Sequence, residues 1–322
     1  MKKEISSIGK EVINLQIRAL KKLKSSINQS FEDAVKAISK CKSKIIVCGV
    51  GKSGIIASKI SATLSSVGTP SFSVSASDCS HGDLGRIVDK DILILISYSG
   101  NTLELKNIIK YAKSNKILLI GIVSNKDSTL YKSSNIKIFT PEVTESGHGI
   151  VPTSSTTSQL AIGDALSVAL MEKKNFGKLD FKKFHPSGSL GAKLKTVEDL
   201  MLTKNKIPFI KENVNMKEAL RVITQKNLGT LIVKNNKGNT SGIITDGTIR
   251  RASEKNKNLQ KLTVKRIMTK NPISVDQDIL CEKALEIMNT NKITSLCVHK
   301  KNNKSRTIGI VHVHTILDAK IQ

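Results

Sequence analysis

The sequence predicts an α/β protein in which a doubly wound parallel sheet is followed by a tandem pair of smaller α+β units. Two observations predict this fold class. Up to about residue 173, short apolar strands alternate with helices, which is typical of a parallel sheet with helices on both faces. Beyond that point a pattern recurs, because 67 residues separate Met201 from Met268 and the same spacing separates Gly242 from Gly309.

The elements of the first part follow from changes in the spacing of apolar residues. Apolar side chains three or four positions apart across residues 4–41 predict a long helix and a short second one at 31–39, with Ser30 as its N-cap. Continuous apolar runs predict buried strands. The strands are expected at 44–51, 71–75, 92–97, 117–123 and 136–139. Between them, helices are expected at about 51–67 and 103–114 and a short turn at about 128–132, and a long helix follows the last strand at about 156–173.

Each repeat of the second part contains an extended stretch, a helix, a strand, a further strand and a last helix. The first four of these are expected at 207–210, 216–226, 231–233 and 242–245, and again at 272–275, 280–289, 295–299 and 309–312. One such unit is small for a stable core, so the two are expected to pack against each other. We therefore expect three domains, at 1–194, 198–255 and 264–322, with a hinge near 194–197.

Composition excludes several classes of protein. With 39% hydrophobic and 24% charged residues, the 322-residue chain is expected to be soluble and globular. Its longest apolar runs are far too short to cross a bilayer, and no apolar signal core follows the first residues. The five cysteines are scattered and form no C-x-x-C pair, which indicates reduced thiols and no zinc knuckle. We expect a cytoplasmic protein without a membrane partner.

The positive charge is large but diffuse. The formal net charge is +26, yet only seven of the 52 basic residues are arginine, and the lysines are spread along the whole chain. Aromatic residues make up 3% and tryptophan is absent, so stacking platforms for bases are not expected. This pattern favours a solvated surface over a nucleic-acid interface, and it would still attract anionic substrates.

Two loops are typical of phosphate binding. Gly49-Val-Gly51-Lys-Ser-Gly54 and Ser97-Tyr-Ser-Gly-Asn-Thr102 each follow a predicted strand and open a predicted helix. Glycines and hydroxyls at a helix N-terminus suit an anion, and ligands of such sheets lie beyond the carboxyl ends of the strands. A third hydroxyl-rich segment, at 152–158, opens the long helix. The simpler interpretation of each loop is a tight turn or a helix cap.

Several motifs together carry a resemblance to a known family. They are Gly51-Lys-Ser-Gly54, Gly68-Thr-Pro-Ser71, His81-Gly-Asp-Leu-Gly85, Ser97-x-Ser-Gly100, Pro152-Thr-Ser-Ser-Thr-Thr157, Gly163-Asp-Ala165 and His185-Pro-Ser-Gly-Ser-Leu-Gly191. In order and spacing, the chain resembles the D-arabinose-5-phosphate isomerases over essentially its whole length. These enzymes join a sugar-isomerase (SIS) domain to two cystathionine-β-synthase-type (CBS) repeats.

The resemblance implies an activity and an assembly. The expected reaction is the reversible conversion of D-ribulose 5-phosphate to D-arabinose 5-phosphate through an enediol, feeding the synthesis of Kdo for lipopolysaccharide. The resemblance further implies a homo-oligomer, a tetramer, that needs no organic cofactor. Such an isomerisation requires a carboxylate base and a group that stabilises the oxyanion.

The resemblance also implies roles for individual residues. The expected catalytic residues are Lys52, Glu104, Glu145 and His185. Lys52 would stabilise the enediolate, either glutamate could be the base, and His185 would assist ring opening or proton transfer, in this family at times in a neighbouring subunit. Residues expected to bind the sugar or its phosphate are Ser53, Gly68, Thr69, His81, Ser97, Ser99, Thr102, Ser154 and Thr157.

The chain departs from the family pattern at three positions. Ser75 stands where a histidine able to help bind an inhibitory metal is frequent, so no intrinsic zinc is expected. Thr248 and Thr315 stand where nucleotide-binding CBS repeats carry an aspartate for the ribose hydroxyls. One hydroxyl replaces a carboxylate poorly. A nucleotide sensor is therefore in doubt, and an assembly or packing module is an equal alternative.

Two other functions remain as alternatives. SIS domains also occur in sugar-phosphate-binding transcription regulators, although the first 40 residues are short for a DNA-binding domain and a linker. Another SIS isomerase, acting on a hexulose or heptose phosphate, is the second alternative, and the CBS pair argues against it.

Overall fold

The structure, a computed structural model, describes residues 4–185, 191, 194–319 and 321. The chain divides into two compact units, Met1–Phe184 and His185–Gln322, and each is described by itself. No helix in the described residues is long and apolar enough to cross a membrane.

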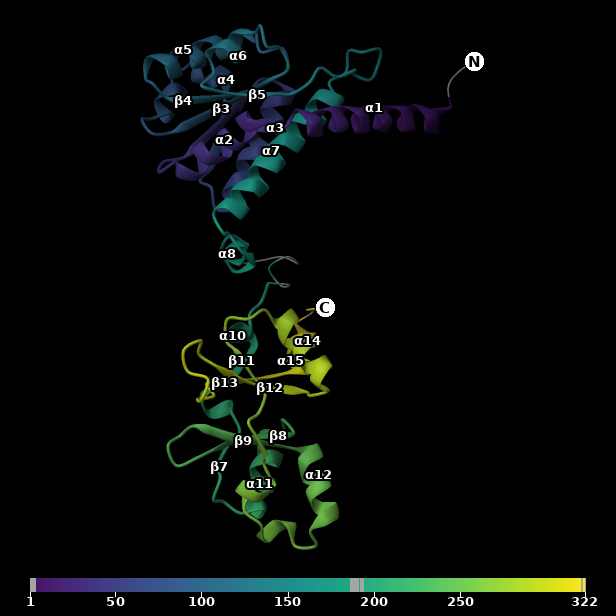
Figure 1. Ribbon diagram of the computed structural model, residues 1–322, viewed down its shortest axis with the longest axis vertical. Helices are drawn as coiled ribbons and strands as arrows, with labels where there is room; N and C mark the ends of the chain where they lie inside the picture. The colour runs from purple at the N-terminus through teal and green to yellow at the C-terminus, as the bar shows by residue number, and fades with distance from the viewer. Residues whose placement is uncertain (1–3, 186–190, 192–193, 320, 322) are drawn as a thin grey trace. The chain divides into compact units, whose positions relative to one another are not determined.

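The first unit is built on a five-stranded parallel sheet with the order β2-β1-β3-β4-β5 (Figure 1). Its strands are β1 (Ile45–Gly49), β2 (Ser71–Ser75), β3 (Ile92–Ser97), β4 (Leu118–Val123) and β5 (Ile136–Phe139). Its α-helices are α1 (Ile5–Ser26), α2 (Gln29–Lys40), α3 (Lys52–Ser66), α4 (Ala76–Cys79), α5 (Lys106–Ser114), α6 (Thr129–Ser133), α7 (Ser154–Lys173) and α8 (Lys178–Phe184). Two 3-10 turns, η1 (Asp83–Arg86) and η2 (Leu103–Leu105), follow β2 and β3.

Side-chain alternation along the strands creates two cores, one on each face of this sheet. Ile45, Val47 and Ile94 pack with residues of α2, α3 and α7, whereas Ile46 and Leu93 pack with residues of α4, α5 and α6. The central strands are buried on both faces, which explains their continuous apolar sequences. The predicted doubly wound sheet is therefore confirmed.

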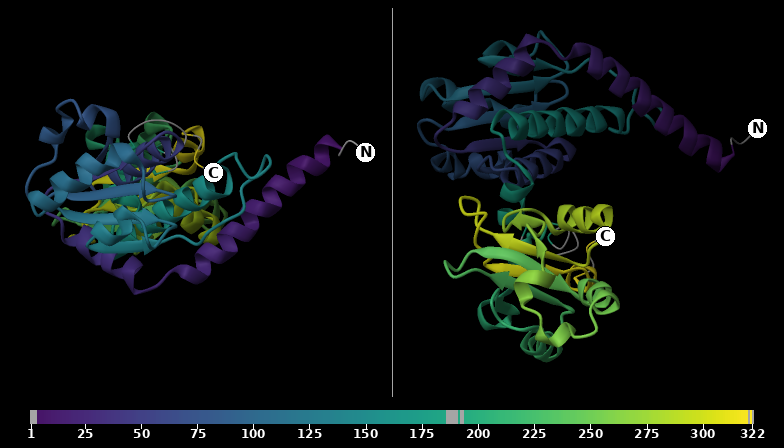
Figure 2. Two further views of the ribbon diagram at one scale, coloured as in Figure 1. Left: turned by 90° about the horizontal axis from the view of Figure 1, so that it is seen from above. Right: turned by 60° about the horizontal axis from the view of Figure 1, so that its bottom comes forward.

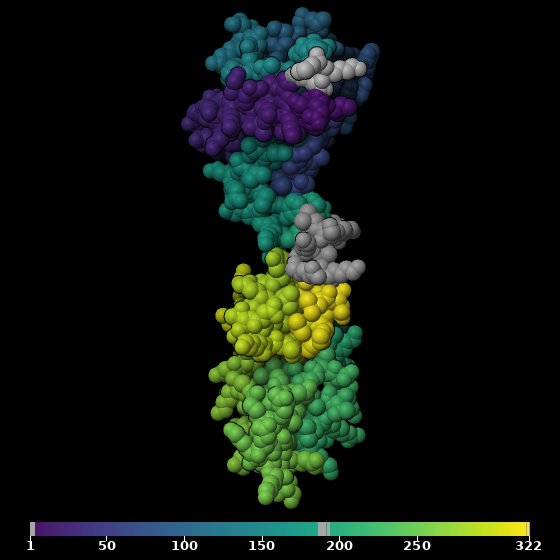
Figure 3. Space-filling model, turned by 90° about the vertical axis from the view of Figure 1, so that its right-hand side faces the viewer, coloured from purple at the N-terminus to yellow at the C-terminus, as the bar shows by residue number. Residues whose placement is uncertain are grey.

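Helix α1 is only partly covered by the first unit. Its C-terminal half buries Ala19 and Leu23, while its N-terminal turns extend away from the sheet (Figure 2). Ile5 and Ile13 on those turns are 87% and 57% exposed. The helix forms a continuous exposed band across the face seen in Figure 3.

The second unit contains two four-stranded sheets, ordered β10-β9-β8-β7 and β11-β12-β13-β6 (Figure 1). The first half comprises α10 (Val197–Leu200), β6 (Leu202–Thr203), η3 (Lys204–Lys206), β7 (Phe209–Lys211), α11 (Met216–Lys226), β8 (Thr230–Lys234), β9 (Thr240–Thr245), α12 (Asp246–Lys255) and η4 (Leu259–Lys261). The second comprises α13 (Val264–Ile267), β10 (Thr269–Lys270), β11 (Ser274–Asp276), α14 (Cys281–Asn291), β12 (Ser295–His299), β13 (Gly309–His312) and α15 (Val313–Asp318).

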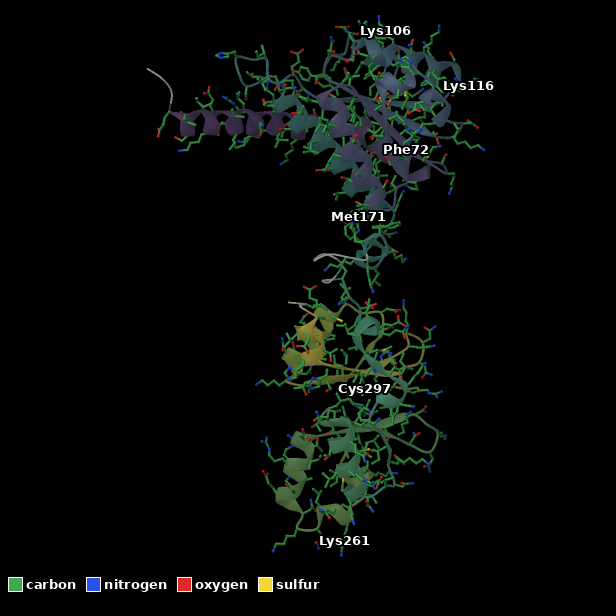
Figure 4. All side chains as sticks on the ribbon, turned by 180° about the vertical axis from the view of Figure 1, so that it is seen from behind. Phe72, Lys106, Lys116, Met171, Lys261 and Cys297 are labelled. Atoms are coloured by element: carbon green, nitrogen blue, oxygen red, sulfur yellow. The ribbon has the colours of Figure 1, made fainter. Side chains whose placement is uncertain are left out.

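The two halves of this unit exchange strands. The short strand β6 of the first half pairs with β13 of the second, and β10 of the second half pairs with β9 of the first. Thr240 and Thr307 stand 67 positions apart, at the spacing of the repeat, and their hydroxyls are hydrogen-bonded at 2.7 Å. Buried side chains of both halves, including Cys297 (Figure 4), form a shared core. The expected packing of the repeats on each other is therefore confirmed.

One cap differs from expectation. Helix α2 begins at Gln29 rather than near Phe31, and its N-cap is Asn28 instead of Ser30. The Asn28 side chain accepts a hydrogen bond from the Ser30 backbone N–H at 2.9 Å. Asparagine caps as well as serine does, so the sequence pattern alone does not separate the two positions.

Candidate active site

The loop after β1 is shaped by glycines. Gly51 has a φ of +58°, and a Cβ on Gly49 would lie 2.6 Å from the backbone oxygen of Ser53. The chain can therefore turn directly from the strand into α3 only with glycine at these two positions. The turn leaves Lys52 exposed at the start of α3 and Ser53 half-buried beside it.

Ser53 connects this loop to the first turns of α7. Its hydroxyl donates a 3.0 Å hydrogen bond to the side-chain oxygen of Gln159, which is 3% exposed. Gln159 is a residue of this contact that the sequence alone does not indicate. A glutamine one position after the hydroxyl-rich segment at 152–158 was the available signal, but only the fold brings it to Ser53.

The loop after β3 is held by its own hydroxyls. The Ser97 hydroxyl accepts the Gly100 N–H at 3.0 Å and shares a 2.8 Å hydrogen bond with the Thr102 hydroxyl. Ser97 is buried, whereas Ser99 is exposed and Thr102 is half-buried. Ser97 therefore shapes the loop, and Ser99 and Thr102 are the hydroxyls that solvent can reach.

The segment before α7 folds back onto the helix N-terminus. The Glu145 carboxylate accepts the backbone N–H groups of Thr153 and Ser154 at 2.8 Å each and that of Ser155 at 3.2 Å. The Thr153 hydroxyl donates a further 3.2 Å bond to it. The N–H donors of the first turn of a helix lack partners within the helix, and the carboxylate satisfies them.

Burial and hydrogen bonding have opposite effects on the pKa of the Glu145 carboxyl group. Burial would raise the pKa of its carboxyl group, but the hydrogen bonds from Ser155, Thr153 and Ser154 outweigh burial and lower the pKa. Next to it, the Ser154 side chain is completely buried, and its hydroxyl has no hydrogen-bond partner in the described structure. Thr157, one turn further along, is half-buried.

The parallel sheet places most of the expected site residues at one edge. Lys52 and Ser53 follow β1, and His81 follows β2. Ser97 ends β3 and residues 98–104 follow it, so all of these residues stand at the carboxyl ends of the strands. The segment with Glu145 and the start of α7 follows β5 at the same edge. Tyr98 links two of these segments, because its hydroxyl accepts the Val143 N–H at 3.1 Å.

Gly68 and Thr69 lie at the opposite edge. They precede β2, and its first residue, Ser71, pairs with Ile45 at the start of β1. Lys174, after the C-terminus of α7, donates a 2.7 Å hydrogen bond to the buried Thr69 hydroxyl. The structure does not bring these two residues to the other loops, because they connect a helix back to a strand. Neither residue therefore belongs to the proposed site.

Two further expectations concern the end of the first unit. His185 is the first residue of the second unit, so its position is described only within that unit. Residues 186–190 of its motif lie outside the described residues. Within the described residues, no group of three or more histidine, cysteine or acidic side chains could hold a metal ion.

Comparison with known proteins assigns the chain to a family. Residues 37–169 match the SIS domain model, and residues 197–255 and 264–321 match the CBS domain model. The arabinose 5-phosphate isomerase KdsD of Yersinia pestis is 38% identical over 99% of this chain and 97% of its own length. The chain belongs to the KdsD family. The Francisella tularensis KdsD, also named an arabinose 5-phosphate isomerase, is 39% identical over 97% of this chain and 96% of its length.

A solved structure supports the family assignment of the first unit. The structure of an Escherichia coli CFT073 protein in complex with arabinose 5-phosphate is 36% identical, with a TM-score of 0.55. The aligned region covers 56% of this chain and 97% of the solved chain. The likeness therefore extends to the part of this KdsD-family chain that carries the loops described above.

The CBS pair contains a cleft of about 600 Å³. Asp246, Arg251 and His312 are among the residues that line it. Thr248, at the position where an aspartate is expected, is buried, and its hydroxyl is hydrogen-bonded to that of Thr245 at 3.0 Å. Thr248 therefore acts as part of the N-terminal cap of α12, because its N–H also donates to Thr245.

Proposed function

We propose that this protein interconverts D-ribulose 5-phosphate and D-arabinose 5-phosphate. The observation that carries the proposal is the sequence identity of 38–39%, over nearly the whole chain, with proteins named arabinose 5-phosphate isomerase. The edge of the sheet that collects a lysine, two carboxylates and several hydroxyls supports it, because an aldose–ketose isomerase needs these groups. We place the product upstream of Kdo in lipopolysaccharide synthesis, as the family resemblance implies.

The loops suggest how the substrate is held. Ser99, Thr102 and the backbone N–H groups at the start of the following helix would bind the phosphate, since hydroxyls and N–H groups there suit an anion. Lys52, exposed at the start of α3, would stabilise the charge that develops on the carbonyl oxygen. His81 would contact sugar hydroxyls, and His185 would assist ring opening. The net charge of +26 favours encounter with an anionic sugar.

We further propose that the protein acts as a homotetramer in the cytoplasm. Helix α1 supports an oligomer, because it leaves the apolar side chains of Ile5, Ile8, Ile13 and Ile17 exposed. Ile13 and Ile17 stand four residues apart and therefore on one face of the helix. The cysteines support a reducing compartment, because all five are free in the described structure. Burial, with a smaller contribution from Cys79, raises the pKa of the Cys48 thiol to about 12.

Direct detection of the product tests the proposed function. Purified protein, treated with chelator, is incubated with D-ribulose 5-phosphate, and D-arabinose 5-phosphate is measured chromatographically. We expect turnover that Lys52→Ala abolishes and that Lys116→Ala, on the exposed turn after α5, leaves unchanged. Turnover of a hexulose or heptose phosphate alone would indicate another isomerase. Saturable sugar-phosphate binding without turnover would indicate a sensor.

A further inference from the structure

Glu104 and Glu145 have different surroundings, although both stand at the carboxyl edge of the sheet. Glu145 is half-buried, and both of its oxygens accept hydrogen bonds. Glu104 is exposed in the 3-10 turn η2, and its carboxylate makes no hydrogen bond or ion pair with any described residue. The two groups are therefore not equivalent candidates for the base.

Glu145 is poorly suited to remove a proton from carbon. Four donors, three backbone N–H groups and the Thr153 hydroxyl, point at its two oxygens. Accepting a proton would neutralise the carboxylate and weaken the charge-assisted bonds that also complete the N-terminus of a 20-residue helix. The lowered pKa agrees with this geometry, since a weaker base removes a carbon-bound proton more slowly.

Glu145 instead acts on the residues that follow it. Its carboxylate fixes Thr153, Ser154 and Ser155, the first residues of the hydroxyl-rich segment. That segment continues to Gln159, which accepts the hydrogen bond from Ser53 in the loop after β1. Glu145 thus holds one end of a chain of contacts that reaches the residue next to Lys52.

We propose that Glu104 is the base of the isomerisation and that Glu145 is a positioning residue that holds the start of α7 against the Lys52–Ser53 turn. This assignment rests on the proposed function. Glu104 stands two residues beyond Thr102, at the end of the loop proposed to bind the phosphate. An unengaged carboxylate there can approach the carbon atoms of a bound sugar phosphate.

The step balances with these residues and solvent water. Glu104 takes a proton from C1 of the ketose, and the C1–H electron pair becomes the C1–C2 double bond. The carbonyl π pair moves to O2, which takes a proton from water, and Lys52 stabilises the charge that develops on that oxygen. Protonated Glu104 then returns its proton to C2, while O1 gives its hydroxyl proton back to water and becomes the aldehyde oxygen. No oxidant, metal or further reactant is consumed.

Hydrogen exchange at carbon distinguishes the two roles. Wild type, Glu104→Gln and Glu145→Gln are incubated with D-arabinose 5-phosphate in D₂O, and deuterium at C2 is followed by NMR. For E104Q we expect turnover and exchange to fall together, by about 10²–10⁴-fold, the contribution of a general base. For E145Q we expect exchange to persist, with KM raised about tenfold and a lower melting temperature. Such an increase in KM corresponds to a weakened set of binding contacts.

The pH dependence supplies an independent readout. In E145Q the acidic limb of the kcat/KM profile should keep its apparent pKa, because the base is still present. In E104Q that limb should disappear from the residual activity. Glu142→Gln is the matched control, since Glu142 is an exposed residue of the same segment and its carboxylate makes no hydrogen bond or ion pair with any described residue. It should retain wild-type rates.

Two results would overturn the assignment. One is an E145Q variant that folds, binds substrate and has lost both exchange and the acidic limb. The other is wild-type exchange in E104Q, a result that does not depend on the folding of any Glu145 variant. Failure of the proposed function is distinguishable from both, because wild type would then produce no D-arabinose 5-phosphate from ribulose 5-phosphate at all.

Discussion

Ser97 and Ser99 stand two residues apart in one loop, yet their hydroxyls have different surroundings. Ser97 is 4% exposed and hydrogen-bonded within the loop, while Ser99 is exposed. The sequence predicts both as phosphate-binding residues, because it shows hydroxyls after a strand and not the direction in which each one lies. Only Ser99 is open to a ligand in this structure.

This difference predicts that one alanine substitution lowers stability and that the other weakens substrate binding. Ser97→Ala should lower the free energy of unfolding by about 1–3 kcal/mol, because the Gly100 N–H and the Thr102 hydroxyl lose a buried partner. Ser99→Ala should change the free energy of unfolding by less than about 0.5 kcal/mol, since it is a surface substitution, and should raise KM for the sugar phosphate. Urea unfolding and steady-state kinetics measure both. Equal stability of the two variants would contradict the structural role given to Ser97.

At the scale of elements, the sheet is predictable because its strands are buried on both faces. The expected bounds 71–75, 92–97 and 136–139 agree with β2, β3 and β5. The predicted end of the first strand is less accurate. The sequence predicts a strand up to residue 51, but β1 ends at Gly49, where the chain turns. The contacts between elements, such as Ser53 with Gln159 and Glu145 with α7, are not visible in the sequence.

One such contact lies where β1 and β3 begin. The Asp91 side chain, fully buried, is 3.0 Å from the Lys44 ammonium and accepts hydrogen bonds from the Ser43 hydroxyl at 2.6 Å and the Val88 N–H at 2.8 Å. Burial would raise the pKa of Asp91, but the hydrogen bonds from Ser43, Val88 and Lys44 outweigh burial and lower it.

Asp91 should therefore contribute a pH-dependent stability. Its folded-state pKa lies below the value of 3.8 that it has when unfolded, so the contribution is complete at neutral pH and is lost as the pH falls below 3.8. At pH 7, Asp91→Asn should cost about 1–3 kcal/mol of unfolding free energy, and the cost should shrink at pH 3. Denaturant unfolding at both pH values measures this. Asp127→Asn, at a 92% exposed side chain, is the control, and a cost for D91N that is independent of pH would contradict the account.

At the scale of the whole molecule, the repeat in the sequence also indicates where the two halves of the second unit meet. The pairs Met201/Met268 and Gly242/Gly309 locate the two halves of the second unit, and each methionine lies against the glycine of the other half. A side chain on either glycine would collide with that methionine, so the glycines are required by the exchange of strands. The exchange itself follows from the sheet pairing and not from the spacing.

The exposed apolar residues of α1 predict where the proposed homotetramer is held together. Ile13→Asp together with Ile17→Asp should dissociate the proposed homotetramer, because a charge buried in an apolar interface without a partner is unfavourable. Val88→Asp, at an apolar position 46% exposed in a loop of the same unit, is the control and should leave the assembly intact. Size-exclusion chromatography with light scattering measures the mass. A double variant with the wild-type mass would show that this face is not the interface.

The sequence by itself determined which helices and strands exist. The spacing of apolar residues reveals them, because a helix buries one side at a regular interval and the central strands of a parallel sheet are buried on both faces. It also determined the family, through short motifs at fixed spacing. The tertiary structure decided which edge of the sheet each residue occupies. It separates Gly68 and Thr69 from the loops with Lys52, and it distinguishes Glu145, bound to a helix N-terminus, from the unengaged Glu104. The physical reason is that hydrogen-bond partners such as Glu145 and Ser155 are brought together by the path of the whole chain, which no local pattern records.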